Sequence, residues 1–253
     1  MAEPLSVVII TRNTERSLEA CLLSVAFADE IVIVDSGSSD KTAAIAAYFG
    51  ARFIFQEWLG YGPQKQFAVE QARHAWVLCI DADERVSETL RINIQQTLQA
   101  PASPAYMMPR CNRFMGRWLR HGEGYPDFNT RLFQRDRARW SSDLVHEHVV
   151  VTGVTGKLTG DLLHESEESI EQYLAKQNRY TSLQAQKLYE KSVKPSVVRM
   201  IFSPVVRFIK FYIWRKGCLD GVPGLVHIAI GCFNSFSKQA KLAELWRVQK
   251  GPE

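Results

Sequence analysis

The chain has 253 residues, of which 46% are hydrophobic and 23% charged, so it can bury a substantial core and is not a disordered protein. Its net charge of +4 is unevenly spread: residues 187–253 hold 12 Lys and Arg against four Asp and Glu, whereas residues 1–186 hold 19 against 23. We expect the basic C-terminal part to face an anionic partner such as lipid headgroups or nucleic acid.

The cysteines and the apolar stretches favour a cytoplasmic protein. Five scattered cysteines without a CxxC pair indicate neither a zinc knuckle nor a disulfide framework. The N-terminus enters a strand-like run almost at once, which leaves no room for a signal peptide. The longest uncharged stretch, between Gly221 and Lys238, is too short and too polar for a membrane span.

Strand and helix patterns alternate over the first hundred residues. Short apolar runs rich in β-branched or aromatic residues predict buried strands at residues 7–10, 30–34, 53–55 and 76–80. Helices are expected between them, with Asn13, then Ser38 or Ser39, and later Ser87 as N-caps, and with Pro63 in a first turn. This order predicts a parallel, doubly wound sheet, which binds ligands at the carboxyl ends of its strands.

The pattern changes after residue 100. Strands of mixed character are expected at residues 106–108, 131–133 and 149–151, with a long Gly- and Arg-rich functional loop at 113–125. Ser169 and Gln172 form a capping-box pair that predicts the start of a long helix. We therefore divide the chain into residues 1–165 and a helical, basic region at 166–253.

Two carboxylates, Asp81 and Asp83, follow the fourth predicted strand, and Asp35 ends the second. An Asp-Ala-Asp turn alone is often only a solvated acidic turn. Here it lies at the ligand-binding edge of the sheet, in a chain without a Gly-rich phosphate loop after its first strand. A divalent cation held by these carboxylates is the other common way to neutralise a diphosphate.

Several motifs together resemble glycosyltransferase family 2, the inverting enzymes of GT-A fold. They are TRN at residues 11–13, VDSGSSDKT at 34–42 and DADE at 81–84. Three later motifs, RLF at 131–133, VHE at 145–147 and LH at 163–164, resemble the bacterial branch that contains lipopolysaccharide-core β-1,4-glucosyltransferases. The resemblance implies an α/β, GT-A-like, mostly parallel sheet with helices on both faces, and a nucleotide-sugar-binding catalytic domain at residues 1–165.

The resemblance also implies roles for individual residues. Those expected on the nucleotide side are Thr11, Asn13, Asp35, Asp40, Lys65 and Asp81. Asp83 would contact a Mg²⁺ or Mn²⁺ ion directly, with Asp81 beside it and His164 completing the metal shell. Three other interpretations stay open: Asp40 as a helix cap, Lys65 as a solvated lysine, and His164 as a hydrogen-bonded structural histidine.

An inverting transfer needs one general base, because the metal takes the charge of the leaving group. The candidates after the metal motif are Asp127, Asp143, Glu147 and Asp161. Glu147 is favoured because it is flanked by His146 and His148 and lies where family members place the catalytic carboxylate. Asp127 is the second choice, since the sequence lacks the Glu-Asp pair common in the family.

Basic residues suggest the acceptor and the location. Guanidinium groups suited to an anionic, phosphorylated or Kdo-bearing glycolipid belong to Arg110, Arg113, Arg117, Arg120 and Arg131. Residues 191–216 mix Lys and Arg with aromatic residues, which is typical of a helix on an anionic leaflet but also fits RNA or a helix covering the catalytic domain.

The sequence thus predicts a metal-dependent transfer of a hexose, glucose from UDP-glucose, onto an inner-core heptose of lipopolysaccharide. The enzyme would be peripheral on the cytoplasmic face of the inner membrane and would bind no nucleic acid. The alternatives are a sugar nucleotidyltransferase and a non-catalytic, membrane-associated scaffold that binds nucleotide sugars.

Overall fold

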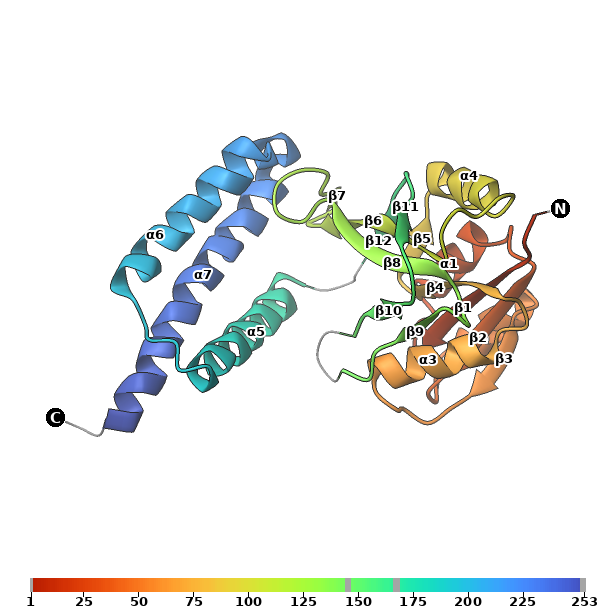
Figure 1. The fold of residues 1–253 in the computed structure, drawn as a ribbon, viewed down its shortest axis with the longest axis horizontal. Helices are drawn as coiled ribbons and strands as arrows, with labels where there is room; N and C mark the ends of the chain where they lie inside the picture. The colour runs from red at the N-terminus through yellow and green to blue at the C-terminus, as the bar shows by residue number, and fades with distance from the viewer. Residues whose placement is uncertain (1, 144–146, 166–168, 251–253) are drawn as a thin grey trace. The chain divides into compact units, whose positions relative to one another are not determined.

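The computed structural model describes residues 2–143, 147–165 and 169–250 (Figure 1). Val145 and His146, which the sequence analysis names beside Glu147, lie outside these residues. The chain divides into two compact units. The first consists of Met1–Cys111 and Asp127–Glu165, and the second of Asn112–Pro126 and Ser166–Glu253.

The first unit is an α/β unit built on one large sheet. Its strands are β1 (Leu5–Thr11), β2 (Glu30–Asp35), β3 (Arg52–Phe55), β4 (Trp76–Asp81), β5 (Glu84–Val86), β6 (Ala105–Phe114), β8 (Asp127–Gln134), β9 (Ala138–Trp140), β10 (Val149–Val151), β11 (Thr155–Lys157) and β12 (Leu162–His164). Its helices are α1 (Leu18–Ser24), α2 (Thr42–Tyr48), α3 (Tyr61–Gln71) and α4 (Glu88–Thr97).

The sheet has the order β3-β2-β1-β4-β8-β6-β12-β5. The first four strands are parallel, as the alternating pattern predicts, whereas β8 runs antiparallel to both β4 and β6. Strands β9 and β10 form a separate two-stranded sheet. The parallel half brings the carboxyl ends of β1, β2 and β4 to one edge, where ligands bind in such sheets.

Alternate residues of the parallel strands bury against helices on opposite faces. In β1, Val7 and Ile9 belong to the core that also contains Leu18 of α1 and Leu90 of α4. Val8, between them, belongs to a second core with residues of α3. This period of two in a strand covered on both sides explains its unbroken apolar run. The prediction of helices on both faces is confirmed.

Two predicted helix starts are wrong, for one physical reason. Asn13 does not cap α1, which begins five residues beyond it at Leu18. Asn13 adopts a left-handed conformation with φ 54°, and its Oδ1 accepts a hydrogen bond from Ser39 N (2.8 Å). Helix α2 begins at Thr42, where the Asp40 carboxylate, instead of a serine, accepts from Thr42 N (3.0 Å). Asn13, Ser38 and Ser39 thus cross-link two loops at the sheet edge instead of capping helices.

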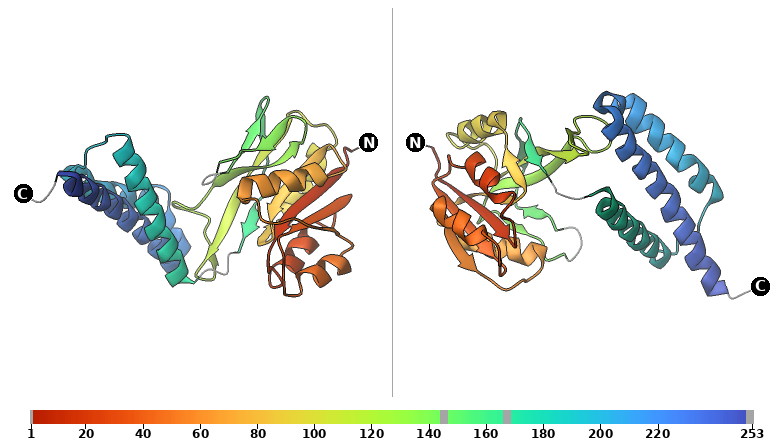
Figure 2. Two further views of the ribbon diagram at one scale, coloured as in Figure 1. Left: turned by 90° about the horizontal axis from the view of Figure 1, so that it is seen from below. Right: turned by 180° about the vertical axis from the view of Figure 1, so that it is seen from behind.

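The second unit is helical. It contains α5 (Ile170–Glu190), α6 (Val197–Phe208), the π-helical turn η1 (Ile209–Trp214), the 3₁₀ turn η2 (Gly217–Asp220) and α7 (Gly221–Lys250). Helix α7 packs against both α5 and α6 (Figure 2). The capping box of Ser169 and Gln172 at the start of α5 is confirmed. Within the described ranges, no helix is both long and apolar enough to span a membrane.

Residues 112–126 belong to this helical unit and are not simply the long loop that their composition predicts. Strand β6 continues to Phe114 and forms a hairpin with β7 (Arg117–Trp118). Beyond the hairpin, both the backbone N–H and Nδ1 of His121 lie within 2.9 Å of the Asp220 carboxylate, and Arg207 forms an ion pair with Glu123. The hairpin is thereby tied to η2 and α6.

Replacing Ser87 by Ala should destabilise the first unit. The Ser87 Oγ accepts hydrogen bonds from Leu90 N (3.3 Å), as the predicted N-cap of α4, and from Asp161 N (3.0 Å). Without the hydroxyl both N–H groups lose this partner, so we expect the free energy of unfolding in urea to fall by about 1–2 kcal/mol. Ser87→Thr, which keeps the hydroxyl, is the control; equal stability of the Ala variant and the wild type would refute the assignment.

Candidate active site

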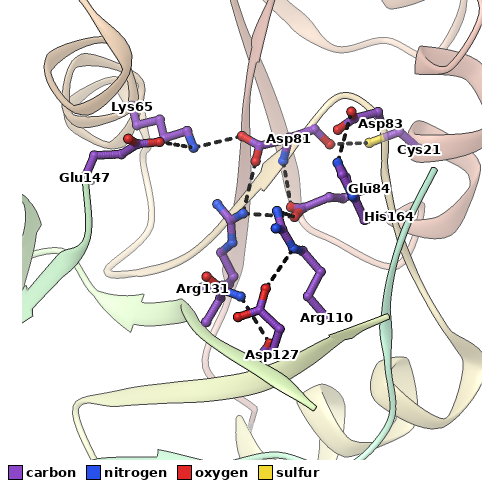
Figure 3. A network of polar contacts seen from close by, with 11 residues as sticks. Cys21, Lys65, Asp81, Asp83, Glu84, Arg110, Asp127, Arg131, Glu147 and His164 are labelled. Carbon is purple, nitrogen blue, oxygen red and sulfur yellow. Dashed lines mark hydrogen bonds and ion pairs between the residues drawn. The ribbon is translucent and has the colours of Figure 1, made fainter. Parts of the chain in front are cut away.

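The acidic turn after β4 lies at the sheet edge, and the pairing of strands β5 and β12 places His164 beside it. Strand β4 is buried up to Ile80 and ends at Asp81, and β5 begins at Glu84. Strand β12 pairs antiparallel with β5, with His164 opposite Glu84 in the register. Residues more than 80 positions apart in the chain therefore meet at the turn (Figure 3).

Asp83 and His164 face each other across this turn. His164 Nε2 lies 3.2 Å from Asp83 Oδ2, and both side chains keep some solvent exposure, 18% and 36%. A carboxylate and an imidazole are donors suited to a divalent cation such as Mn²⁺. Within the part of the chain that the structure describes, no group of three or more His, Cys, Asp and Glu forms a metal site. The pair could supply two ligands to a metal ion, and metal binding by Asp83 and His164 stays a prediction.

Asp81 points toward cations of the chain and not toward Asp83. Its Oδ1 lies 3.0 Å from Lys65 Nζ, and its Oδ2 accepts a hydrogen bond from Arg131 Nη2 (3.0 Å). Burial would raise the pKa of Asp81, but the charges of Arg131 and Lys65 outweigh burial and lower the pKa. Asp81 is thus a fixed anion, and its share in metal binding stays a prediction.

Glu84 and Arg131 form the buried centre of the site. Glu84 is fully buried; its Oε2 accepts from Asp81 N (3.0 Å) and its Oε1 from Arg131 Nη2 (2.9 Å). Burial raises the pKa of Glu84 although Arg131 opposes this, whereas burial would lower the pKa of Arg131 but Glu84 and Asp81 raise it. Glu84 is not among the site residues predicted from sequence, and Arg131 is expected there only as one of the arginines for the acceptor. The one available signal is that Glu84 shares an inward-facing period-two position with Val86.

Lys65 lies between Asp81 of the acidic turn and the candidate base Glu147. Its Nζ lies 3.0 Å from Asp81 Oδ1, 3.4 Å from Glu147 Oε1 and 4.7 Å from the centre of the Trp140 ring. The side chain is 5% exposed, and the Asp81 charge raises the pKa of Lys65 although burial would lower it. The interpretation of Lys65 as a solvated lysine is therefore wrong.

The backbone of α3 explains how Glu147 comes so close to Lys65. At Gly62, in the first turn of α3, an added Cβ would lie 2.2 Å from Ser141 O and 3.4 Å from Glu147 Cβ. Only glycine permits this approach. The segments on either side of residues 144–146 are thus held against the start of α3.

Asp127, the second candidate base, lies on another branch of the same network. Arg110 Nε is 3.3 Å from Asp127 Oδ2, and Arg110 Nη1 is 3.7 Å from Glu84 Oε1. Arg110 thus connects Asp127 to Glu84, as Lys65 connects Glu147 to Asp81 (Figure 3). Of the five arginines expected to bind acceptor, Arg110 and Arg131 are engaged in this network. The other three, at residues 113, 117 and 120, belong to the second unit.

The remaining predicted nucleotide contacts form a cluster of their own at the ends of β1 and β2. The buried Asp35 carboxylate accepts hydrogen bonds from Thr11 Oγ1 (2.8 Å), Gly37 N (2.9 Å), Ser38 N (2.7 Å) and Ser38 Oγ (2.5 Å). Four donors fill the lone pairs of a carboxylate. Asp35 therefore shapes the loop at residues 36–39. The predicted contact of Asp35 with a nucleoside is not tested by this geometry.

Cysteine chemistry has no place in the site. Cys21 and Cys79 lie near the acidic turn and are buried. Burial raises the pKa of both thiols, that of Cys79 to about 12 although Lys65 and Arg131 oppose this, and the Glu84 carboxylate raises the pKa of Cys21 further. Neutral thiols are poor nucleophiles and poor metal ligands. The chemistry available here is that of carboxylates, an imidazole and fixed cations.

An acidic turn and buried cations at the carboxyl edge of a parallel sheet define a class of α/β proteins that bind anionic, nucleotide-like substrates. Residues 6–151 match the sequence model of the family described as Glycosyl transferase family 2. This match covers more than half of the chain, which therefore belongs to glycosyltransferase family 2 and is a glycosyltransferase. Family membership favours transfer over the nucleotidyltransferase alternative.

Relatives match over nearly the whole chain. It is 34% identical to the lipopolysaccharide core biosynthesis glycosyltransferase LpsC of Rhizobium meliloti, covering 98% of this chain and 95% of the relative. It is 32% identical to an uncharacterized glycosyltransferase of Rickettsia bellii, covering 97% and 88%. Among solved structures, S. aureus TarS 1-349 in complex with UDP-GlcNAc aligns over 97% of this chain and 92% of that chain, with 13% identity and a TM-score of 0.49.

Arg131→Met should strongly destabilise the fold, because the buried Glu84 loses the cation that donates a hydrogen bond to it. Removing one partner of a buried ion pair costs about 3–5 kcal/mol, and we expect a loss of this size in urea unfolding. Arg137→Met, at an exposed turn, is the control and should change stability by less than about 0.5 kcal/mol. Equal stability of the two variants would show that Arg131 does not neutralise Glu84.

Proposed function

We propose that this glycosyltransferase transfers a hexose, glucose from UDP-glucose, with inversion onto an inner-core heptose of lipopolysaccharide or a similar anionic glycolipid. The observation that carries the proposal is the facing pair of Asp83 and His164, 3.2 Å apart beside a buried cation network. The name of the relative LpsC, a lipopolysaccharide core biosynthesis glycosyltransferase, supports the acceptor class.

On the donor side, Asp83 and His164 would hold a Mg²⁺ or Mn²⁺ ion, which supplies Lewis-acid neutralisation of the diphosphate. Asp81 is oriented by Lys65 and Arg131, so its carboxylate is fixed before substrate arrives. A fixed carboxylate can accept hydrogen bonds from ribose hydroxyls without reorganisation. The loop held by Asp35 would line the nucleoside side of the site, together with Thr11, Asn13 and Asp40.

On the acceptor side, Glu147 would take the proton of the attacking hydroxyl. It is partly exposed, with 24% of its side chain accessible, as a group that must meet an incoming acceptor has to be. Its contact with Lys65 Nζ orients the carboxylate and ties it to the donor side of the same site. This coupling favours Glu147 over Asp127, which contacts Arg110 but not Lys65.

A glycolipid acceptor brings the reaction to a membrane. We include in the proposal that the protein is peripheral on the cytoplasmic face of the inner membrane, with the basic region at residues 166–253 nearest the lipid. An acceptor that carries phosphate or Kdo would suit the guanidinium groups expected to bind it, those of residues 113, 117 and 120 included. Such a location keeps the site close to a substrate that cannot leave the bilayer.

Asp83→Asn should remove the metal dependence of donor binding. Calorimetry of UDP with Mn²⁺ should show tight binding to the wild type that chelation by EDTA weakens. The variant should bind at least about 10- to 100-fold more weakly, because losing a ligand costs no less than losing an outer-shell partner. Asp136→Asn, in an exposed turn, is the matched control. Unchanged affinity in a folded Asp83→Asn protein would refute the metal site.

Glu147→Gln should reduce kcat by about 10²- to 10⁴-fold, the usual contribution of a general base, while UDP affinity stays that of the wild type. The assay uses heptose-containing core oligosaccharide and a panel of nucleotide sugars, with and without Mg²⁺ or Mn²⁺. Asp127→Asn is measured in parallel and should retain far more activity. The reverse order would assign the base to Asp127, and wild-type protein that binds donor but transfers nothing would favour the scaffold.

A further inference from the structure

The segment that forms α6 and η1 has an unusual charge pattern. Between Glu190 and Asp220 there is no acidic residue. The same stretch carries seven basic residues: Lys191, Lys194, Arg199, Arg207, Lys210, Arg215 and Lys216. One of them, Arg207, is neutralised by Glu123. The segment is therefore strongly cationic within the second unit.

The same segment is apolar on the side that its own unit does not cover. Half-buried residues recur at helical spacing along this segment and form a narrow seam; they are residues 200, 203–204, 207–208 and 211–212. On this seam Arg207 donates a hydrogen bond to Ser235 of α7. Outside this seam, large apolar side chains are between 49% and 83% exposed: Val197, Val198, Ile201, Phe202, Val205, Val206, Ile209, Ile213 and Trp214.

A helix that is apolar on both sides is normally buried on both. Within the described helix α6 no residue is buried, so the seam against α7 accounts for only part of its apolar surface. Scattered exposed leucines or valines would need no explanation, but a contiguous patch on one element indicates a binding surface. What remains to be identified is the partner.

A shallow groove on this surface combines apolar walls with cations. It measures about 470 Å³, and Phe202, Val206 and Phe211 line it together with Arg199 and Lys210. Lys210 Nζ stays within 5.2 Å of the centre of the Phe211 ring. Long basic side chains beside an apolar wall can bind phosphates with their ends while their stems cover acyl chains.

Charge and geometry together distinguish the possible partners. A second copy of the chain docked through this face would bring two cationic segments together with no acid between residues 190 and 220 to offset them. RNA would leave the apolar side chains in water. An anionic bilayer offers phosphates for the cations and hydrocarbon for the apolar residues, and Tyr212 and Trp214 are residue types that favour the membrane interface.

We propose that α6 and η1 form the surface by which the protein binds an anionic lipid bilayer, lying in the interface with Phe202, Val206 and Trp214 toward the acyl chains. Arg199 and Lys210 bind the lipid phosphates. The membrane surface rests on the proposed function, because a glycolipid acceptor is the reason for the enzyme to bind a bilayer. It deepens that function by assigning membrane binding to one face of the second unit. The contact is interfacial and does not span the membrane.

Flotation of the full chain with vesicles tests the surface. The protein should float with phosphatidylglycerol and phosphatidylethanolamine vesicles, much less with phosphatidylcholine alone, and less as salt rises. Arg199→Gln with Lys210→Gln should lower partitioning roughly 30-fold, since each basic residue contributes roughly fivefold at such a surface. Phe202→Ser with Trp214→Ser should lower it at least about tenfold.

Matched variants on the first unit control for charge and hydrophobicity. Arg137→Gln with Arg139→Gln removes the same charge, and Tyr48→Ser with Val154→Ser removes exposed apolar groups, so both should float like the wild type. Wild-type protein that does not float, or α6 variants that float as it does, would overturn the proposal. So would sedimentation showing a dimer that the Phe202 and Trp214 changes dissociate, or tighter binding to RNA than to the vesicles.

A water-soluble acceptor allows the proposed sugar transfer to be tested separately from the proposed membrane surface. On deacylated core oligosaccharide, the α6 variants should transfer sugar at the wild-type rate, because their folding and active site are intact. Floating protein without transfer would refute the proposed reaction and leave the membrane surface standing. Transfer without flotation would refute the surface alone.

Discussion

The active site depends on one buried ion pair, between Glu84 and Arg131. A carboxylate with no solvent exposure is stable only when it is hydrogen-bonded and neutralised, and Arg131 does both at 2.9 Å. The same guanidinium also donates to Asp81, and Glu84 accepts from the Asp81 backbone. The pair therefore fixes the main chain and the side chain of the acidic turn at once.

From this pair the network reaches the first and second candidates for the general base, Glu147 and Asp127. Lys65 of α3 links Asp81 to Glu147, and Arg110 of β6 links Glu84 to Asp127. The elements involved are far apart in sequence, and their meeting depends on the antiparallel strand β8 lying beside the parallel strand β4. The departure from a purely parallel sheet is thus what places Arg131 next to the turn. A purely parallel sheet would provide the acidic edge with Lys65 of α3 but without Arg131 of β8 and Arg110 of β6.

The parts that the sequence predicts are those governed by local pattern. The buried strand at residues 7–10 and the Ser87 cap follow from neighbouring residues alone, and both are confirmed. Lys65 was expected among nucleotide-binding residues, with a solvated position as the alternative, yet it is buried against Trp140. No local pattern could reveal this, because both acidic partners of Lys65 come from other elements. The prediction that Asn13 caps α1 is wrong because its hydrogen-bond partner, Ser39, lies in another loop.

The charges of the network also bear on why a metal suits this site. Five carboxylates meet there, on Asp81, Asp83, Glu84, Asp127 and Glu147, against three cations, on Lys65, Arg110 and Arg131. Counted as formal charges, these eight side chains sum to −2, which one divalent ion would balance. Asp81 and Glu84 are already engaged by fixed cations, so the unbalanced charge falls on the more exposed Asp83. By engaging Asp81, the cation network leaves Asp83 and His164 as the pair that would hold the proposed metal ion.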